Sequence, residues 1–212
     1  MEPRSMPQNQ KRPRRRPSDL RVAAVQLRSI DDYDRNVRRI HEVLVDCSAA
    51  GVQVAAFPEC AVTGYETEAI LRPTLRHLRQ TERELAETCR RHRIHALIGL
   101  PWRSRGVIRN AVVVLDATGR LVTRHAKVHL VGQDRAWDCE PGTTPCPVFP
   151  VGRALCSSII CHDSRYPELC RLPVLAGARV LFYLSHEAPL TKEWKMNPYR
   201  AQVQARAAEN SV

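Results

Sequence analysis

Short apolar runs alternate with longer amphipathic segments along most of the chain. Apolar runs bounded by polar or turn residues predict strands, here at residues 21–27, 53–57, 96–100, 107–115, 121–125, 154–160 and 179–184. Apolar positions three and four apart predict helices, here at residues 33–50, 81–93 and 198–209 and after residue 167. The two runs on either side of Thr118-Gly119 predict a hairpin. This alternation predicts an α/β fold in which two sheets carry outer helices.

Cys161 directly follows the apolar run at residues 154–160. Pro167 and Glu168 then favour the first turn of a helix, because Pro has no amide hydrogen and Glu is stabilised at the positive helix end. A thiol on such a strand-to-helix turn is held outward near free backbone N–H groups, as a nucleophile must be. A structural core cysteine is the alternative, since unpaired cysteines are among the most buried residue types.

Two charged residues also stand near the ends of predicted strands. Glu59 follows Pro58 after the run at residues 53–57, and Lys127 interrupts the half-apolar stretch at residues 121–130. Charged groups at strand ends are usually solvated, which is the alternative interpretation. Because open α/β sheets place their sites at one end of the sheet, Glu59, Lys127 and Cys161 are expected to converge there.

These residues lie in three motifs that resemble the signature regions of the nitrilase superfamily of carbon–nitrogen hydrolases. The motifs are FPE at residues 57–59, KVHL at residues 127–130 and CHDSRYPE at residues 161–168. Their order fits, with 68 residues from Glu59 to Lys127 and 34 more to Cys161. The resemblance extends to residues 22–27, 110–119, Trp194 and 205–210. It implies the αββα four-layer sandwich of this superfamily, with Glu59, Lys127 and Cys161 as a catalytic triad.

Such a triad can hydrolyse a carbon–nitrogen bond without a metal or an organic cofactor. Glu59 would accept the thiol proton of Cys161 and later return it to the leaving amine. Lys127 would lower the cost of placing two negative groups together and would stabilise the oxyanion. The backbone N–H of His162 is the natural second oxyanion donor, and one such donor is typically worth about 3–4 kcal/mol of barrier. The resulting acyl-thioester would be hydrolysed by a water that Glu59 activates.

The residues after Cys161 favour an amide or N-carbamoyl substrate over a nitrile. In true nitrilases the nucleophile is usually followed by Trp and Glu. Residues 162–168 are nearer the aromatic-Asp-x-Arg-aromatic-Pro-Glu pattern of amidases and N-carbamoyl amidohydrolases. Arg165 is a candidate clamp for a substrate carboxylate, since a guanidinium pairs with carboxylates bidentately. A structural ion pair of Arg165 with Glu168 or another acid is the favoured alternative.

Three residues depart from the family pattern. Asp134 stands where many members carry a glutamate that supports the triad. Its shorter side chain is expected to miss its partner by about a bond length, and such a misplacement can be costly in rate. His162 replaces the usual aromatic residue. Pro173 is expected to kink or end the helix that begins at Pro167, because an interior proline costs about 3 kcal/mol.

The resemblance also predicts that the usual C-terminal strands are lacking, because related chains continue past the Glu209-Asn210 segment. Without them, a sheet edge and apolar surface would be left open. Three hypotheses therefore remain: a cysteine-dependent amidohydrolase, a nitrilase acting on nitriles, and a truncated, inactive relative that acts as a binding protein. Members of the superfamily usually pair through the helices that flank the nucleophile, which implies a homo-oligomer.

The composition fits one enzyme domain at residues 19–212. With 43% hydrophobic residues the chain can build a sizeable core. No apolar stretch reaches the roughly 20 residues of a membrane span, and no secretory signal precedes the first strand, so a cytoplasmic location is expected. The eight cysteines form no Cys-x-x-Cys pair and are expected to be reduced thiols. A zinc site formed by Cys139, Cys146, Cys156 and His162 lacks suitable spacing, so no metal is expected.

Nearly half of the net charge of +11 lies at the N-terminus. Residues 1–17 hold six basic residues against Glu2 and are rich in Pro. Such a segment buries too little apolar surface to fold, so residues 1–18 are expected to form a disordered tail. The tail could contact nucleic acid non-specifically, but no aromatic-rich basic module in the domain supports specific recognition.

Overall fold

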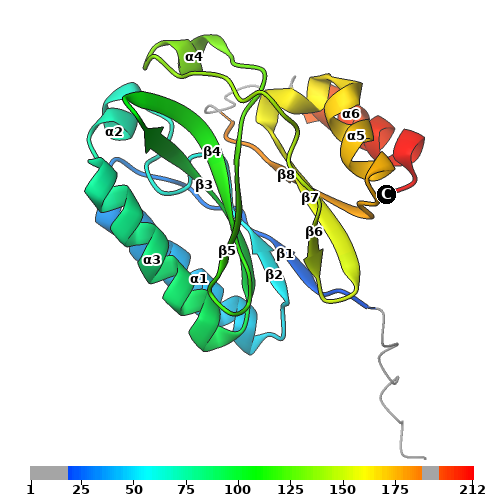
Figure 1. Cartoon of the computed structure of the whole chain (residues 1–212), viewed down its shortest axis with the longest axis horizontal. Helices are drawn as coiled ribbons and strands as arrows, with labels where there is room; N and C mark the ends of the chain where they lie inside the picture. Colours follow the sequence, from blue (N-terminus) through cyan, green and yellow to red (C-terminus); the bar gives the residue numbers. More distant parts are fainter. Residues whose placement is uncertain (1–18, 188–195) are drawn as a thin grey trace, which may run out of the picture.

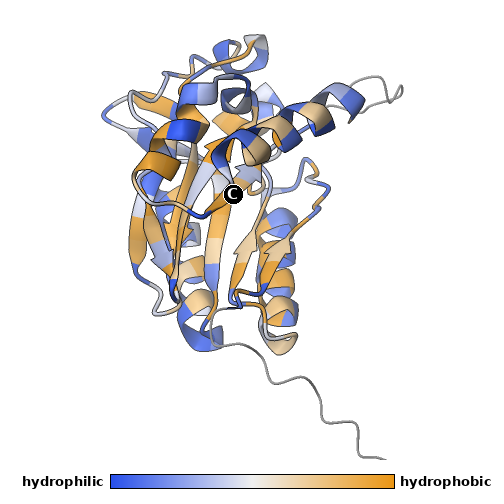
Figure 2. Cartoon of the chain, turned by 90° about the vertical axis from the view of Figure 1, so that its right-hand side faces the viewer, coloured by the Kyte–Doolittle hydropathy of each residue, from blue (hydrophilic) through white to orange (hydrophobic). Residues whose placement is uncertain are grey.

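The computed structural model describes residues 19–187 and 196–212. The predicted tail at residues 1–18 and Trp194 lie outside these ranges. Within these ranges eight strands, one more than the sequence pattern predicts, form two sheets, and the sheets pack face to face between two pairs of helices (Figure 1). Hydrophobic residues gather in the strands, and hydrophilic residues lie on the outer faces of the helices (Figure 2).

The larger sheet has the strand order β1-β2-β3-β4-β5. Its strands are Val22–Ala24, Val54–Ala56, His95–Ser104, Val107–Leu115 and Leu121–Ala126. The first three strands run parallel, and β3, β4 and β5 form an antiparallel meander. The predicted hairpin is therefore confirmed, and the Asp116 carboxylate closes it by accepting hydrogen bonds from the backbone N–H groups of Thr118 and Arg120.

The smaller sheet has the order β6-β7-β8, formed by Phe149–Val151, Ala154–Ile160 and Val180–Leu184. Strand β6 is antiparallel to β7, and β8 is parallel to it. Within the described residues β8 pairs only with β7. The 3₁₀ helix η1 (Cys161–Arg165) and helix α5 (Pro167–Leu175) follow β7 directly. Pro173 lies in the last turn of α5, which ends two residues later, as expected for an interior proline.

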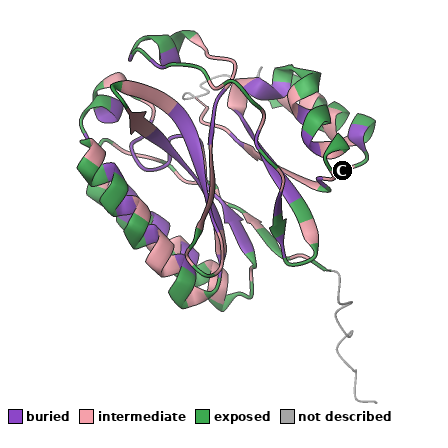
Figure 3. Cartoon of the chain, viewed as in Figure 1, coloured by how far each residue is buried: buried purple, intermediate pink, exposed green. Residues whose placement is uncertain are grey.

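Two hydrophobic clusters lie between the layers of the fold and hold them together. One lies between the larger sheet and helices α1 (Tyr33–Ala49) and α3 (Leu75–His92), where Ile40, Leu44 and Leu85 are fully buried. The other lies between the sheets and joins residues such as Leu97 and Ile160. The strands that supply both clusters are buried between exposed helix faces (Figure 3). The outer layer on the smaller sheet is α5 with α6 (Met196–Asn210) (Figure 1).

Several elements differ from the sequence prediction, among them β1, which is shorter than residues 21–27, and β3, which extends beyond residues 96–100. Helix α3 begins at Leu75 rather than near Thr81, because the Thr74 hydroxyl caps it by accepting from the His77 N–H. Helices α2 (Thr67–Leu71) and α4 (Gly132–Arg135) and strand β6 were not predicted. Each is too short for a periodic apolar pattern to be recognised.

Candidate active site

The direction of the strands brings Glu59 and Lys127 to one edge of the larger sheet. Strand β2 is parallel to β3, and two antiparallel steps from β3 to β5 restore the same direction. Glu59 and Lys127 follow the C-terminal ends of β2 and β5, so both lie at the same edge. Cys161 follows β7, and Ser185 and His186 follow the parallel strand β8. The expected convergence at strand ends therefore takes place between the two sheets.

Gly99 in β3 permits the close packing of the turn that carries Glu59. A Cβ atom at Gly99 would stand 2.7 Å from the Glu59 Cα, and nearer still to backbone atoms of Pro58 and Cys60. The Val62 N–H also donates to the Gly99 carbonyl oxygen at 3.3 Å. The turn thus lies directly on β3, and only glycine leaves room for it.

Substituting Gly99 by alanine is expected to displace the Glu59 turn and to lower the free energy of unfolding by about 1–3 kcal/mol, the usual cost of overpacking. Denaturant unfolding beside a thermal melt would measure this. Gly132→Ala is the matched control, because nothing lies within 4 Å of a Cβ atom at Gly132. A Gly99→Ala protein as stable as the wild type would show that the turn does not depend on this packing.

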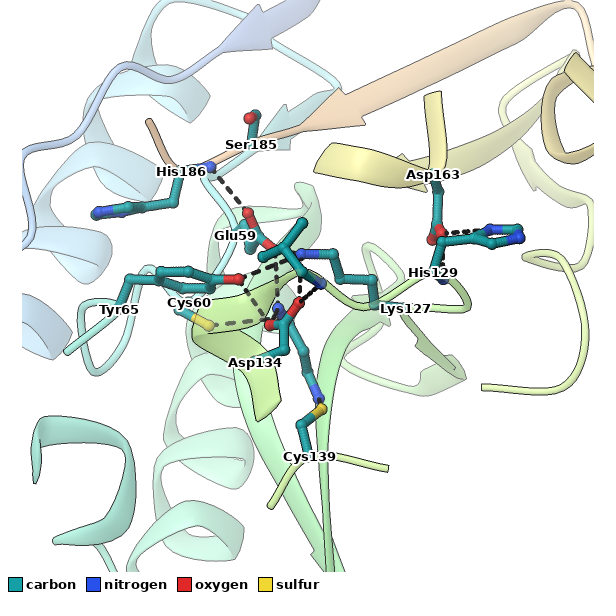
Figure 4. Close-up of polar contacts among 12 residues, drawn as sticks. Glu59, Cys60, Tyr65, Lys127, His129, Asp134, Cys139, Asp163, Ser185 and His186 are labelled. Atoms are coloured by element: carbon teal, nitrogen blue, oxygen red, sulfur yellow. Dashed lines mark hydrogen bonds and ion pairs between the residues drawn. The ribbon is translucent and has the colours of Figure 1, made fainter. Parts of the chain in front are cut away.

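Lys127 is the centre of a buried charge cluster (Figure 4). Its Nζ lies 2.8 Å from Glu59 Oε1 and 2.8 Å from Asp134 Oδ2, and all three side chains are 0% exposed. It also donates to the Tyr65 hydroxyl at 3.2 Å. Burial lowers the pKa of Lys127, but the charges of Glu59 and its other acidic neighbours raise it more, so the net pKa is raised. The side chain is therefore an ammonium ion at neutral pH.

Asp134 reaches Lys127 in spite of its short side chain, so the expectation that it would miss its partner is wrong. Helix α4 brings the aspartate backbone close to the cluster, where the Val131 N–H donates to Asp134 Oδ2 at 2.9 Å. The Tyr65 hydroxyl donates to Oδ1 at 2.6 Å. Burial raises the pKa of Asp134, but the Lys127 charge and these hydrogen bonds outweigh it and leave the pKa lowered. Asp134 is therefore a carboxylate.

Three further residues complete the cluster, and sequence reasoning gave none of them a role. Asn110 Nδ2 donates to Glu59 Oε1 at 2.7 Å, and the backbone N–H of His186 donates to Glu59 Oε2 at 3.0 Å. The His186 ring stacks on Tyr65 with ring centroids 5.2 Å apart. The one signal in the sequence was Asn110 itself, a polar residue within a predicted strand, directly before the apolar run at residues 111–115.

Cys161 has a left-handed backbone conformation, with φ of 46°, at the junction of β7 and η1. Its side chain is partly buried and packs against the hydrophobic cluster between the two sheets. Burial, followed by the charge of Glu59, raises the pKa of Cys161 to about 12, although Lys127 and Ser185 oppose the shift. The resting residue is therefore a protonated thiol at neutral pH, and it needs a base before it can attack.

Labelling of Cys161 by iodoacetamide is expected to accelerate from about pH 7 to about pH 10, since the thiolate fraction grows about tenfold per pH unit below a pKa near 12. A free thiol with a pKa of about 8.5 levels off within this range, so glutathione is the control. Peptide mapping by mass spectrometry would follow Cys161 alone. A rate that is already maximal near pH 7 would mean a resting thiolate and would contradict the need for a base.

Asp163 joins the segment after Lys127 to the turn that carries Cys161. Its buried carboxylate accepts from the backbone N–H groups of Val128 at 3.1 Å and His129 at 2.7 Å. Burial raises the pKa of Asp163, and the hydrogen bonds from His129 and Val128 oppose this shift. Asp163 was part of the quoted motif, but the sequence did not show that it holds two site segments together.

His162 and Arg165 lie on the same 3₁₀ turn. The backbone N–H of His162 is in the first turn of η1, where amide hydrogens have no partner within the helix. Arg165 is exposed, and its guanidinium lies 6.0 Å from the ring centroid of Tyr199 in α6. Among residues 19–187 and 196–212 it has no acidic partner, so the favoured interpretation of an ion pair with Glu168 is wrong for this part of the chain.

A cavity of about 850 Å³ lies beside the cluster, lined among others by Pro58, Tyr65, Ser185 and His186. The part of the chain that the structure describes holds no group of three or more His, Cys, Asp or Glu side chains placed to bind a metal ion. Its helices are also all too short or too polar to cross a membrane.

The chain belongs to the carbon–nitrogen hydrolase family, whose sequence model matches residues 21–212. It is 27% identical to nitrilase homolog 2 of Dictyostelium discoideum, over 77% of this chain and 53% of that protein. It is 26% identical to the 2-oxoglutaramate amidase of Bacillus subtilis (strain 168), over 80% of this chain and 64% of that enzyme. The chain thus spans between about half and two thirds of these relatives.

The fold agrees with this assignment. The solved structure of a nitrilase-superfamily amidase from Nesterenkonia AN1 superimposes with a TM-score of 0.84 at 23% identity. The match covers 93% of this chain and 75% of that one. The predicted αββα sandwich of the superfamily is therefore confirmed.

Proposed function

We propose that this protein hydrolyses a small amide through a covalent intermediate on Cys161, with Glu59 as general base and Lys127 as oxyanion stabiliser. The observation that carries the proposal is the fully buried Glu59–Lys127 pair, 2.8 Å apart, at strand ends that face the turn carrying Cys161. A carboxylate and an ammonium that merely stabilised the fold would have no reason to lie beside the strand end of a thiol with a left-handed backbone conformation.

The first step transfers the Cys161 proton to Glu59 as the sulfur attacks the carbonyl carbon. Glu59 Oε1 is already bonded by Lys127 and Asn110, and Oε2 accepts from the His186 N–H, so the carboxylate is held in one orientation. The attack moves negative charge to the substrate oxygen. The Lys127 ammonium and the His162 N–H would stabilise that oxyanion, at about 3–4 kcal/mol for one donor.

The second step expels ammonia or an amine, which takes the proton held by Glu59. The C–N bond breaks as the carbonyl re-forms, and an acyl-thioester stays on Cys161. Glu59, again a carboxylate, then takes a proton from water as the water oxygen attacks the thioester carbon. Collapse of this second tetrahedral intermediate releases the carboxylic acid and returns the proton to the sulfur. Asp134 supports both steps because it shares the Lys127 ammonium and keeps it in place.

Amides are favoured over nitriles by the residues that follow Cys161 and by two relatives whose names denote amidases. An N-carbamoyl compound offers the same C–N bond and the same oxyanion. Arg165 is proposed as a weak clamp for a substrate carboxylate, since its guanidinium is exposed and has no acidic partner in the described residues.

An ammonia-release screen over small amides, N-carbamoyl amino acids and nitriles tests this proposal. Release from one or more amides or carbamoyl compounds by the wild type, but not by Cys161→Ala, is the expected result. Ammonia release from nitriles alone would mean that the protein is a nitrilase and would contradict the proposed amidase activity. A folded protein that is inactive on every compound would favour an inactive relative that acts by binding.

The proposal also includes pairing of two copies through helix α5, where Leu172 is 49% and Leu175 is 74% exposed. Apolar side chains this exposed on one helix are typical of an interaction surface. Gel filtration of the wild type beside Leu175→Glu would test the pairing, and a wild-type monomer would refute it.

The proposal places the protein in the cytoplasm. The catalytic thiol must stay reduced, and all eight cysteines are free, which supports this setting.

A further inference from the structure

Asn110 contacts every charged member of the buried cluster and carries no charge itself. Its Nδ2 donates to Glu59 Oε1 at 2.7 Å and to Asp134 Oδ1 at 3.0 Å. Its backbone carbonyl oxygen accepts from the backbone N–H of Lys127 at 2.8 Å. Because Asn110 is 1% exposed, bulk water has no access with which to replace these bonds. One residue of β4 therefore fixes two carboxylates and the lysine backbone relative to one another.

Two cysteines contact Asn110, one at its side chain and one at its backbone. The Cys60 thiol donates to Asn110 Oδ1 at 3.7 Å, and the Asn110 backbone N–H donates to Cys139 Sγ at 3.3 Å. A flipped amide would turn its oxygen toward two carboxylates, which can only accept hydrogen bonds. The NH₂ group must therefore face Glu59 and Asp134.

The charge balance explains why an amide suits this position. Two carboxylates share the single Lys127 ammonium, so the buried cluster carries one net negative charge. Two N–H bonds from a neutral amide favour the ionised carboxylates and reduce their repulsion. A second cation here would pair with Glu59 and weaken it as a base more than the neutral amide does.

We propose that Asn110 is a positioning residue, which spaces Glu59 and Asp134 around Lys127 and keeps Glu59 directed at Cys161. This inference rests on the proposed amide hydrolysis for its kinetic test. It assigns Asn110 no contact with substrate.

Three variants separate hydrogen-bond donation from space-filling. Asn110→Leu keeps the volume and loses both donors, so kcat is expected to fall about 100-fold with KM changed far less. Asn110→Ser keeps one donor and should recover part of the rate. Asn110→Asp keeps the shape but adds a third carboxylate. Its protonated form donates one bond, so its rate relative to wild type should rise as the pH falls.

A double-mutant cycle tests the same inference without turnover. Denaturant unfolding should show that Asn110→Leu costs less stability in a Glu59→Gln background than in the wild type, since the charge that Asn110 stabilises is gone. Asn36→Leu is the matched control. Within the described residues the side chain of this buried asparagine bonds only to Ile30 and Val62, so its cost should be equal in both backgrounds.

The outcomes separate the two claims. A wild type that is inactive on all amides refutes the proposed function, and the unfolding cycle then decides the role of Asn110 alone. Additive stability losses for Asn110 and Glu59, or wild-type kcat in Asn110→Leu, would overturn the inference. If Asn110→Leu does not fold, kcat and the double-mutant unfolding cycle are measured with Asn110→Ser instead. Wild-type kcat or additive stability losses in that variant would likewise overturn the inference.

Discussion

Replacing Cys161 by alanine is expected to abolish the proposed amide hydrolysis and leave the fold intact. Without the sulfur no acyl-enzyme can form, and loss of a nucleophile typically costs about 10⁴-fold or more in kcat. The side chain is small and partly exposed, so the free energy of unfolding should change by no more than about 1 kcal/mol. Ammonia release and a thermal melt on the same preparation measure both effects.

Cys47→Ala provides the matched control for the Cys161 variant. Cys47 is also a free, partly exposed thiol, but it lies on α1, away from the charge cluster. Its removal should leave kcat unchanged. Turnover that persists in Cys161→Ala, or that disappears equally in Cys47→Ala, would contradict the assignment of Cys161 as nucleophile.

Replacing Lys127 by methionine is expected to have the largest effect on stability. The substitution leaves two buried carboxylates without a counter-charge, and breaking a buried pair in this way typically costs about 3–5 kcal/mol. For a domain of this size, such a loss lowers Tm by roughly 6–20 °C. The variant should also be inactive, because the oxyanion loses its charged donor. Thermal and denaturant unfolding measure the stability loss.

Glu59→Gln separates catalysis from stability. Glutamine keeps the shape of the side chain, and Lys127 stays paired with Asp134, so the unfolding free energy should change by only about 1 kcal/mol while activity is lost. Arg39→Met is the surface control for Lys127→Met. Arg39 and Glu42 form an exposed pair worth about 0–1 kcal/mol, so breaking it should change the free energy of unfolding little. A Lys127→Met protein that melts like the wild type would show that the buried charges are not mutually dependent.

Much of the fold followed from local pattern. The long strands and helices have enough turns or alternations for their period to be recognised. Glu59, Lys127 and Cys161 stood out because each is a reactive group at the end of an apolar run. That Glu59 and Lys127 share one edge of the larger sheet could be expected from strand direction, since strands that run the same way end at the same edge. The place of Cys161 opposite them depends on how the two sheets pack.

The supporting residues depend on contacts that no local pattern encodes. Asn110, Tyr65 and His186 reach the cluster from strands and loops far apart in the chain, and their partners become visible only when the sheets are packed. The reach of Asp134 was misjudged because it depends on where the four-residue helix α4 places the backbone. Side-chain length was the only quantity that the sequence offered.

Trapping the acyl-thioester would show directly whether Cys161 is the nucleophile. Wild-type protein is mixed with an amide that it turns over, quenched in acid within the first turnovers, digested and analysed by mass spectrometry. The peptide containing Cys161 is expected to gain the mass of the acyl group. The corresponding peptide of Cys161→Ala, treated identically, should gain none. An acyl group on any other residue, or turnover with no covalent adduct at Cys161 under conditions where deacylation limits the rate, would contradict it.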